Sequence, residues 1–451
     1  MSERPWDGRR LHLVGVGGAG MSGYARAAHA LGATVSGSDR ASTPYLERLR
    51  EQGVLDAAIG HDARNLPAGE HVELIYSSAI AADNPERVAA RSRGLPERPR
   101  ADLLAELTSL RPTIAVAGAH GKTTTASMLV HILRDQGADP SWLVGSAVGA
   151  GLDNSHWSED GWLIVEADES DRSMLSLHVQ IAVLTNVELD HHATFASLGE
   201  LRDAFRRFLA HATRGIVIWD RPELLELSPT RQAVEIVAYD ARDLLLREGG
   251  SRFRWRGHEV DLTVPGAHNA LNATAALEAA RLAGIDELGA AVSLAGFAGA
   301  GRRFQRVGTT PAGAVVIDDY AHHPTEVAAT LAAARTLGAD RVVAVFQPHL
   351  FSRTAMLARE FGAALARADV AAVLDVYPAR ERAAEHPGVS GLTIARAASE
   401  RAEGRPVLWL ASFDAAARVL GGMLGAGDVC VAMGAGDVDT LARRLVVDGG
   451  R

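Results

Sequence analysis

The chain has 451 residues, a formal net charge of −9 and a single cysteine, Cys430. This length favours two to four domains, and the acidic balance argues against a general nucleic-acid-binding surface. One cysteine excludes an intrachain disulfide, which is typical of a reducing cytoplasm, and no apolar run reaches transmembrane length. We therefore expect a cytoplasmic protein with neither a nucleic-acid nor a membrane partner.

The first segment, placed at residues 1–111, begins with a strand and a glycine turn. Residues 11–14 form the predicted strand, and Gly15, Gly17 and Gly20 follow in the pattern G-x-G-x-x-G before a predicted helix. Asp39 ends the next strand about 20 residues further on, which completes the dinucleotide-binding fingerprint. Because a glycine turn at a helix N-terminus binds any pyrophosphate, a nucleotide-sugar and NAD both remain open. An NAD-dependent oxidoreductase is the alternative function.

The second segment, placed at residues 112–308, opens with a phosphate-binding loop. GAHGKTTT, residues 118–125, lies between a predicted buried strand at 113–117 and a predicted helix. Lys122 in this loop is the only lysine, since the other 45 of the 46 basic residues are arginines. This indicates a need for a compact ammonium rather than for positive charge alone. Val116 stands where the strict pattern has glycine, so we predict a shortened loop that binds a nucleoside triphosphate.

Acidic strings follow two further predicted strands of this segment. EADESD at residues 166–171 follows one strand, and NVELDHH at 186–192 follows the other. Acids at the carboxyl ends of strands in a nucleotide-binding sheet are placed to hold Mg²⁺, and a solvated acidic loop is the alternative. His191 beside Asp190 is either a second metal ligand or a loop histidine without that role.

The third segment, placed at residues 309–451, continues the alternation of strands and helices, which favours mostly parallel sheets in all three segments. Shortly before this segment, Arg302 and Arg303 follow glycines. They would either stabilise the charge on a transferring phosphoryl group or form part of a basic linker. Asp319, after a predicted strand, would hold a ribose hydroxyl or cap the next helix. Arg353, after another strand, suits a carboxylate.

In this order and spacing, the motifs resemble the Mur ligases of peptidoglycan synthesis. The resemblance runs from Gly15 to Asp437, and its most specific strings are GGAGMSG at 17–23, SSAI at 77–80, EADESD at 166–171 and DYAHHPTE at 319–326. It implies three α/β domains: an N-terminal Rossmann-like domain at 1–111 for the UDP-sugar, a central P-loop ATPase-like parallel sheet at 112–308 for ATP, and a C-terminal Rossmann-like domain at 309–451 for the amino acid. The glycine turn would then bind a UDP-sugar rather than NAD.

The resemblance also implies roles for individual residues. UDP-sugar-binding residues would be Gly17, Gly18, Ala19, Gly20, Met21, Ser22, Ser77 and Ser78 at the diphosphate, with Asp39 and His61 near the nucleoside. ATP-binding residues would be Gly118, His120, Gly121, Lys122, Thr123 and Thr124 at the phosphates, His268, Asn269 and Asn272 at adenine, Asp319 at ribose and Arg303 at the γ-phosphate. Two Mg²⁺ ions, with Mn²⁺ as an alternative, would be held by Thr123, Glu166 and His191. The amino acid would meet Tyr320, His322, His349 and Arg353, and the catalytic set would be Lys122, Glu166, His191 and Arg303.

The implied reaction is an ATP-dependent ligation. The lactyl carboxylate of UDP-N-acetylmuramate attacks the γ-phosphate, and the amine of an amino acid then attacks the acyl phosphate. Sibling ligases typically carry a second, carbamylated lysine at the metals, whereas this chain has only Lys122. It therefore falls with the alanine-adding branch or with the murein-tripeptide recycling ligase, UDP-N-acetylmuramate:L-alanyl-γ-D-glutamyl-meso-diaminopimelate ligase, and Ser170 favours the former.

The expected partners are the small molecules UDP-N-acetylmuramate and L-alanine, for a monomer or a homodimer. Leu350 stands where some relatives have an arginine, which leaves more of the carboxylate binding to Arg353.

Overall fold

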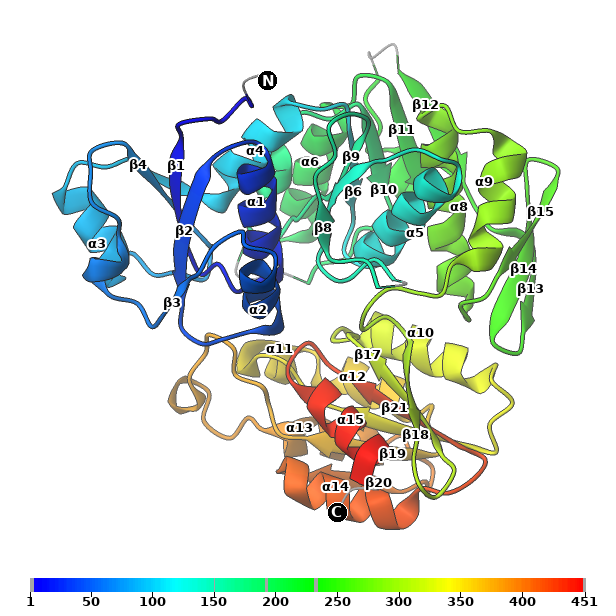
Figure 1. Ribbon diagram of the computed structural model, residues 1–451. Helices are drawn as coiled ribbons and strands as arrows, with labels where there is room; N and C mark the ends of the chain where they lie inside the picture. Colours follow the sequence, from blue (N-terminus) through cyan, green and yellow to red (C-terminus); the bar gives the residue numbers. More distant parts are fainter. Residues whose placement is uncertain (1–3, 150, 191–193, 231–233, 449–451) are drawn as a thin grey trace. The chain divides into compact units, whose positions relative to one another are not determined.

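The computed structural model describes residues 4–149, 151–190, 194–230 and 234–448 (Figure 1). The chain divides into two compact units. Unit 1 comprises Met1–Asp240 and Asn272–Ser293, and unit 2 comprises Ala241–Leu271 and Leu294–Arg451. Strands alternate with helices and parallel pairings predominate, so the predicted α/β class is confirmed. Within the described ranges, no helix is long and apolar enough to cross a membrane.

Unit 1 begins with a five-stranded parallel sheet in the order β3-β2-β1-β4-β5. The chain passes from β1 to β2 on one side, whereas β4 pairs with β1 on the other, so the strand order reverses beside β1. Ligands of such sheets bind at the carboxyl ends of the strands at this reversal. The strands are β1 Arg10–Val14, β2 Thr34–Asp39, β3 Ala58–Ile59, β4 Val72–Tyr76 and β5 Glu97–Pro99; the helices are α1 Ala19–Ala30, α2 Pro44–Glu51, η1 Ala63–Asn65, α3 Pro85–Ser92 and α4 Arg100–Ser109.

A seven-stranded sheet in the order β12-β11-β10-β6-β9-β7-β8 forms the rest of unit 1. All five residues of β6 are buried, and β6 lies between β10 and β9, so the loops that follow these three parallel strands share one edge. The strands are β6 Thr113–Ala117, β7 Ser141–Leu143, β8 Ser155–His156, β9 Leu163–Glu166, β10 Ile181–Leu184, β11 Gly215–Trp219 and β12 Glu235–Tyr239. The helices of this region are α5 Lys122–Asp135, η2 Ser173–Ser176, α6 Leu198–Leu209, α7 Pro222–Leu225, α8 Ala267–Leu282, which belongs to unit 1 from Asn272 onwards, and α9 Glu287–Ser293.

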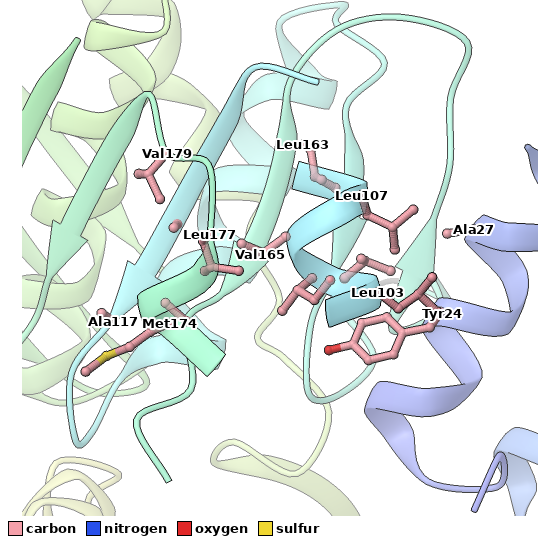
Figure 2. Packing of buried hydrophobic residues seen from close by; sticks show 14 of the residues in the cluster. Tyr24, Ala27, Leu103, Leu107, Ala117, Leu163, Val165, Met174, Leu177 and Val179 are labelled. Carbon is pink, nitrogen blue, oxygen red and sulfur yellow. The ribbon is translucent and has the colours of Figure 1, made fainter. Parts of the chain in front are cut away.

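The two sheets of unit 1 share a hydrophobic core. Figure 2 shows Tyr24 of α1 and Leu103 of α4 beside the side chains of the seven-stranded sheet, among them Val165 of β9. Apolar burial of this extent holds the packed elements together. The helix that follows the glycine turn and the sheet that carries the phosphate loop therefore share one packed core.

Unit 2 contains an antiparallel three-stranded sheet that the sequence analysis did not predict. It is formed by β13 Arg242–Arg247, β14 Gly250–Trp255 and β15 His258–Leu262. Its signal was present, because buried Phe253 and Trp255 alternate with polar residues. Arg256 and Gly257 both have positive φ, +47° and +88°, which is the two-residue type I′ hairpin turn.

The other sheet of unit 2 has six strands in the order β16-β17-β21-β18-β19-β20, all parallel except the edge strand β16. Separate apolar clusters, one containing Phe346 and the other Leu441, form its core. The strands are β16 Gln305–Thr309, β17 Val315–Asp319, β18 Arg341–Phe346, β19 Val370–Leu374, β20 Val407–Leu410 and β21 Asp428–Met433. The helices are η3 Leu294–Gly296, α10 Pro324–Arg335, α11 Phe351–Met356, α12 Ala358–Leu365, η4 Ala383–Glu385, α13 Gly391–Ser399, α14 Phe413–Met423 and α15 Val438–Asp448.

Candidate active site

The phosphate loop joins β6 to α5 in the predicted strand–loop–helix order. Gly118 and Gly121 have φ values of +131° and +83°, which glycine adopts readily. A Cβ at Gly118 would lie 2.2 Å from Thr185 Oγ1, and one at Gly121 would lie 2.4 Å from Asn272 Oδ1. Only glycine therefore lets the loop pass this close to its neighbours. The loop ends at the N-terminus of α5, where backbone N–H groups and the helix dipole favour an anion.

Polar side chains after β10 hold this loop. Asn186 Oδ1 accepts from the His120 backbone N–H at 2.9 Å, and Asn186 Nδ2 donates to the His120 carbonyl, also at 2.9 Å. Thr185 Oγ1 donates to the same carbonyl at 2.6 Å, and His120 Nε2 lies 2.8 Å from a carboxylate oxygen of Glu188. Thr185, Asn186 and Glu188 thus clamp the loop, a role that the sequence analysis did not assign to them.

Lys122 lies among the acids that follow β9. Its Nζ is 2.9 Å from Glu169 Oε2 and 2.5 Å from the Gly118 carbonyl oxygen. Burial alone would lower the pKa of the ammonium, but the carboxylates of Glu169 and Asp168 raise it above its usual value. Lys122 is therefore cationic at neutral pH and is held at the loop that it is predicted to serve.

Glu166, the last residue of β9, is available to a cation. Its Oε1 accepts from the Gly145 backbone N–H at 2.5 Å. Unlike Glu169, it has no ion pair within the described ranges. Its carboxylate and the hydroxyl of Thr123, at the start of α5, are hard oxygen donors of the kind that Mg²⁺ prefers. These residues fit the ion. His191, the predicted second metal ligand, lies outside the described residues.

The glycine turn is held by the end of β2. Gly17 N–H donates to Asp39 Oδ2 at 2.8 Å, and Thr43 Oγ1 donates to the Gly17 carbonyl at 2.8 Å. Asp39, expected near the nucleoside, thus braces the turn. Ser77 N–H donates to the Val14 carbonyl at 3.2 Å, so the serine loop and the glycine turn meet at the carboxyl ends of β4 and β1.

The other predicted UDP-sugar residues are divided between surface and core. Ser78 is exposed, whereas Met21 is part of the hydrophobic core, and Ser22 is buried with its hydroxyl donating to the Ala19 carbonyl at 2.9 Å. Gly18 caps α1, which begins at Ala19, so residues 19–21 present backbone N–H groups rather than side chains to an anion, whereas the Ser22 N–H donates to the Gly18 carbonyl at 2.9 Å.

His61 belongs to a buried polar network around Glu86. His61 Nδ1 lies 3.0 Å from Ser38 Oγ and 3.2 Å from Glu86 Oε1. Glu86 is fully buried, its other oxygen is 2.7 Å from His12 Nε2, and it also accepts from Asn65 Nδ2 at 3.2 Å. Burial would raise the pKa of Glu86, but the hydrogen bonds from His12, Ser38 and Asn65 hold it below its usual value.

In unit 2, Asp319 ends β17 with both carboxylate oxygens engaged. Oδ2 accepts from the Phe304 N–H at 2.8 Å, and Oδ1 accepts from the Ala321 N–H at 2.7 Å. Burial raises its pKa to about 6, against the opposing effect of the Arg303 charge. The alternative that Asp319 caps the next helix is wrong, because the N-cap of α10 is His323. Arg303 lies with its guanidinium carbon 5.1 Å from the Tyr320 ring centroid.

The predicted amino-acid residues come together in unit 2. The rings of His322 and Tyr320 are 5.4 Å apart, and those of His322 and His349 are 6.2 Å apart. Buried Arg353 places Nη1 3.4 Å from His349 Nδ1. Tyr377, which the sequence analysis missed, stacks on His349 at 5.8 Å, because a parallel bridge joins residues that are far apart in the sequence.

The three residues predicted at adenine lie on the first turns of α8. Burial lowers the pKa of His268 to about 4, so it is neutral at pH 7. Asn269 Nδ2 donates to the Pro265 carbonyl at 2.7 Å. Asn272 belongs to unit 1 and is the residue that approaches Gly121 of the phosphate loop.

Arg302 is the arginine of the glycine–arginine string that has a clear structural role. Nε lies 3.1 Å from Asp318 Oδ2, while the two terminal nitrogens donate to the carbonyls of Gly434 and Gly436 at 2.8 and 2.9 Å. It therefore ties β17 to the glycine turn after β21, for which the sequence indicated no partner.

Known proteins match this arrangement along nearly the whole chain. The profile described as Mur ligase family, catalytic domain, matches residues 10–111; the Mur ligase middle domain matches 116–280; and the Mur ligase, glutamate ligase domain, matches 302–436. The chain belongs to the Mur ligase family. The predicted family resemblance is thereby confirmed, and an NAD-dependent oxidoreductase is not favoured.

Individual relatives of this Mur ligase agree with one another. A UDP-N-acetylmuramate–L-alanine ligase from Rubrobacter xylanophilus is 43% identical over 97% of this chain and 99% of its own. The ligase of the same name from Mycolicibacterium vanbaalenii is 42% identical over 99% of this chain and 98% of its own. The solved UDP-N-acetylmuramate-alanine ligase MurC from Thermotoga maritima has a TM-score of 0.82 at 26% identity, over 97% of this chain and 98% of that one.

Proposed function

We propose that this Mur ligase joins L-alanine to the lactyl carboxylate of UDP-N-acetylmuramate with the hydrolysis of ATP, in the cytoplasmic part of peptidoglycan synthesis. The observation that carries the proposal is the phosphate loop with its lone lysine, Lys122, held at the N-terminus of α5 by Gly118 and Glu169. Full-length similarity to two enzymes named for this reaction supports it.

The substrates are assigned to three segments. Residues 1–111 bind the UDP-sugar at the turn that Asp39 braces, residues 112–308 bind ATP, and residues 309–451 bring the amino acid. The family matches at 10–111, 116–280 and 302–436 support this division. The proposed partners are small molecules only. The proposed oligomeric state of the protein is a monomer or a homodimer.

The reaction proceeds in two displacements. A lactyl carboxylate oxygen attacks the γ-phosphorus of ATP, the bond to the β-phosphate oxygen breaks, and ADP leaves. The amine of L-alanine then attacks the acyl carbon, inorganic phosphate leaves, and the amine loses a proton. Neither step needs a protein nucleophile, so catalysis consists of positioning and of charge neutralisation.

Each charged residue has a task in this scheme. Lys122 and Arg303 neutralise the phosphate oxygens as charge moves towards the leaving group. Thr123 and Glu166 would hold Mg²⁺, with His191 proposed at a second ion, and the metal would add Lewis-acid charge at the phosphates. Buried Arg353, beside His349, suits the carboxylate of the amino acid.

Phosphate release from ATP tests the proposal. The full chain is incubated with Mg²⁺, ATP and UDP-N-acetylmuramate, and then separately with L-alanine, glycine, L-serine, D-glutamate or the tripeptide L-alanyl-γ-D-glutamyl-diaminopimelate. Release with L-alanine that is lost in Lys122→Ala is expected. Release only with the tripeptide would identify a recycling ligase. No release with any acceptor would contradict a ligase and leave a nucleotide-binding scaffold.

A control separates loss of chemistry from loss of folding. Lys122→Ala is expected to retain UDP-N-acetylmuramate binding in calorimetry, because the predicted sugar-binding residues lie on the five-stranded sheet, whereas Lys122 follows β6 of the other sheet.

A further inference from the structure

One arginine, Arg100, bonds to the acidic string near the phosphate loop and also lies close to the glycine turn. Arg100 is the first residue of α4 and follows β5, whose Pro99 pairs with Tyr76 at the end of β4. Arg100 therefore lies at the edge of the five-stranded sheet where Ser77 follows β4 and the glycine turn follows β1. None of the roles proposed above involves it.

Two nitrogens of Arg100 hold the acidic string of the seven-stranded sheet. Nε donates to Asp171 Oδ2 at 2.8 Å, and Nη2 donates to Asp168 Oδ2 at 2.9 Å while lying 2.6 Å from Asp171 Oδ2. The two carboxylates are fixed in turn by the backbone, because Asp168 Oδ1 accepts from the Ser170 N–H and Asp171 Oδ1 accepts from the Ser173 N–H. The guanidinium thus sets the path of the string that begins at Glu166.

The third nitrogen faces the glycine turn. A Cβ at Gly20, in the first turn of α1, would lie 3.2 Å from Arg100 Nη1. Among the described residues Nη1 has no hydrogen-bond acceptor, although Nε and Nη2 are both bonded. Buried Tyr24, one turn further along α1, interacts electrostatically with the same guanidinium. Burial raises its pKa to about 12, against the lowering effect of Arg100. An N–H donor is therefore left at the helix N-terminus where an anion is favoured.

The charges continue from Arg100 to the phosphate loop. Asp168 lies between two cations: burial would raise its pKa, but Arg100 first and Lys122 second lower it to about 2. Lys122 in turn contacts Glu169, the next residue of the string. The signs alternate from Arg100 through Asp168 and Lys122 to Glu169, so a change at Arg100 alters the field at Lys122, which is predicted to bind the ATP phosphates.

Arg98, two residues before Arg100, serves as a comparison, because it does not bond to the acidic string. It pairs with Glu73 at 3.0 Å and Glu106 at 3.2 Å, both in the N-terminal segment. Its side chain is 29% exposed, against 18% for Arg100. The two arginines have the same charge and similar burial, but only Arg100 reaches the acidic string.

We propose that Arg100 is a positioning residue for both nucleotide substrates, which fixes the acidic string of the ATP site with two nitrogens and offers the third to the UDP-sugar at the start of α1. This inference rests on the proposed function. A planar guanidinium serves three directions at once, whereas an ammonium is a point charge on a flexible stem. Arg100→Lys should therefore retain the charge and lose the geometry.

The test measures binding and stability in the full chain. Dissociation constants of UDP-N-acetylmuramate and of a non-hydrolysable ATP analogue with Mg²⁺ are measured separately by calorimetry, for the wild type, Arg100→Lys, Asp171→Asn and Arg98→Gln. Thermal unfolding of each variant is recorded beside them. Asp171→Asn keeps the guanidinium and removes one of the charges that orient it, so it reports on positioning even where Arg100→Lys is less stable.

We expect Arg100→Lys to unfold near the wild-type temperature and to bind both ligands about tenfold more weakly or worse, as for other residues that orient a site through its ligands. Asp171→Asn should weaken both in the same sense, and Arg98→Gln neither. Wild-type affinity in both Arg100→Lys and Asp171→Asn, or a loss of affinity for one ligand only, would contradict the positioning role of Arg100 and leave the proposed function unaffected. Failure of the wild type itself to bind UDP-N-acetylmuramate would overturn the proposed function instead.

Discussion

One glycine precedes helix α5 and another follows it, and the two have nearly the same φ. Gly121 precedes it with φ +83°, and Gly137 follows it with φ +81°. A Cβ at Gly121 would lie 2.4 Å from Asn272 Oδ1, whereas one at Gly137 would meet no atom within 4 Å. Since both substitutions carry the same left-handed strain, their comparison isolates the contact of the phosphate loop with Asn272.

Gly121→Ala is expected to abolish most ATP binding, because Asn272 or the loop must move to admit the methyl group. Gly137→Ala should cost only about 1 kcal/mol of unfolding free energy from its positive φ and leave ATP affinity unchanged. Titration with an ATP analogue and urea unfolding of both variants check this. Equal ATP affinity in the two variants would mean that the close approach at Gly121 does not matter for binding.

Asp319 is predicted to make ATP binding depend on pH near 6. Burial raises its pKa to about 6, so the carboxylate is ionised above that pH and accepts hydrogen bonds, and it is protonated below it. If Asp319 binds the ribose, the affinity for ATP should weaken as the pH falls from 7 to 5. ATP itself titrates in this range, so the measurement is the ratio of the wild-type dissociation constant to that of Asp319→Asn. This ratio should favour the wild type at pH 7 and approach one at pH 5; a constant ratio would speak against the assignment.

At the scale of elements, Glu86 joins β1, β2 and α3 through one buried carboxylate. It contacts His12 of β1 at 2.7 Å and Ser38 of β2 at 2.8 Å. Glu86→Gln removes the charge at unchanged size and turns an N–H₂ towards these donors. We expect a loss of about 3 kcal/mol of unfolding free energy at pH 7, measured in urea. Glu70→Gln, at an exposed position, should stay within about 0.5 kcal/mol of the wild type.

The pH dependence of that difference has a definite sign. The pKa of Glu86 is lower in the folded protein than its usual value, so its contribution is complete above about pH 4.3 and is lost as the pH falls through the folded value. The difference between the wild type and Glu86→Gln should therefore shrink below pH 4.3. A difference that is constant down to pH 3 would contradict an ionised Glu86 in the native state.

The elements that the sequence predicted are those with a strong local signal. β6 has the predicted bounds, 113–117, because a continuous apolar run of this length is typical of a buried parallel strand. The antiparallel sheet β13–β15 was missed, although β14 alternates, because its short strands are rich in charged residues and β13 is mostly exposed.

Site residues, too, could be predicted where the signal is local in the sequence and not where it depends on distant segments. The phosphate loop is continuous in sequence, so Gly118, Gly121 and Lys122 could be found together. Arg100 and Tyr377 could not, because their partners are brought to them by strand order and by a bridge between distant segments. No local spacing encodes such contacts.

At the scale of the molecule, the groups that would bind the UDP-sugar, the ATP phosphates and the amino acid are predicted on three different sheets. UDP-sugar residues end or follow β1 to β4, phosphate- and metal-binding residues follow β6 or end β9, and amino-acid residues follow β17 and β18, in the sheet that also carries Asp319, predicted at the ribose of ATP. Each ligand should then stabilise the chain independently, by about 2.7 kcal/mol at 100 times its dissociation constant, or about 5 °C in the unfolding temperature.

Variants should remove these shifts one at a time. Lys122→Ala should lose the shift from an ATP analogue and keep that from UDP-N-acetylmuramate, while Asp39→Asn, which weakens the bond from the Gly17 N–H by removing the charge of its acceptor, should do the reverse. Arg100→Lys is expected to diminish both, because its guanidinium contacts the acidic string and faces Gly20. Thermal unfolding of the three variants with each ligand checks the pattern. If Lys122→Ala and Asp39→Asn each lost both shifts, the two sites would not be separable, and the double loss in Arg100→Lys would follow from the common core of unit 1 rather than from Arg100.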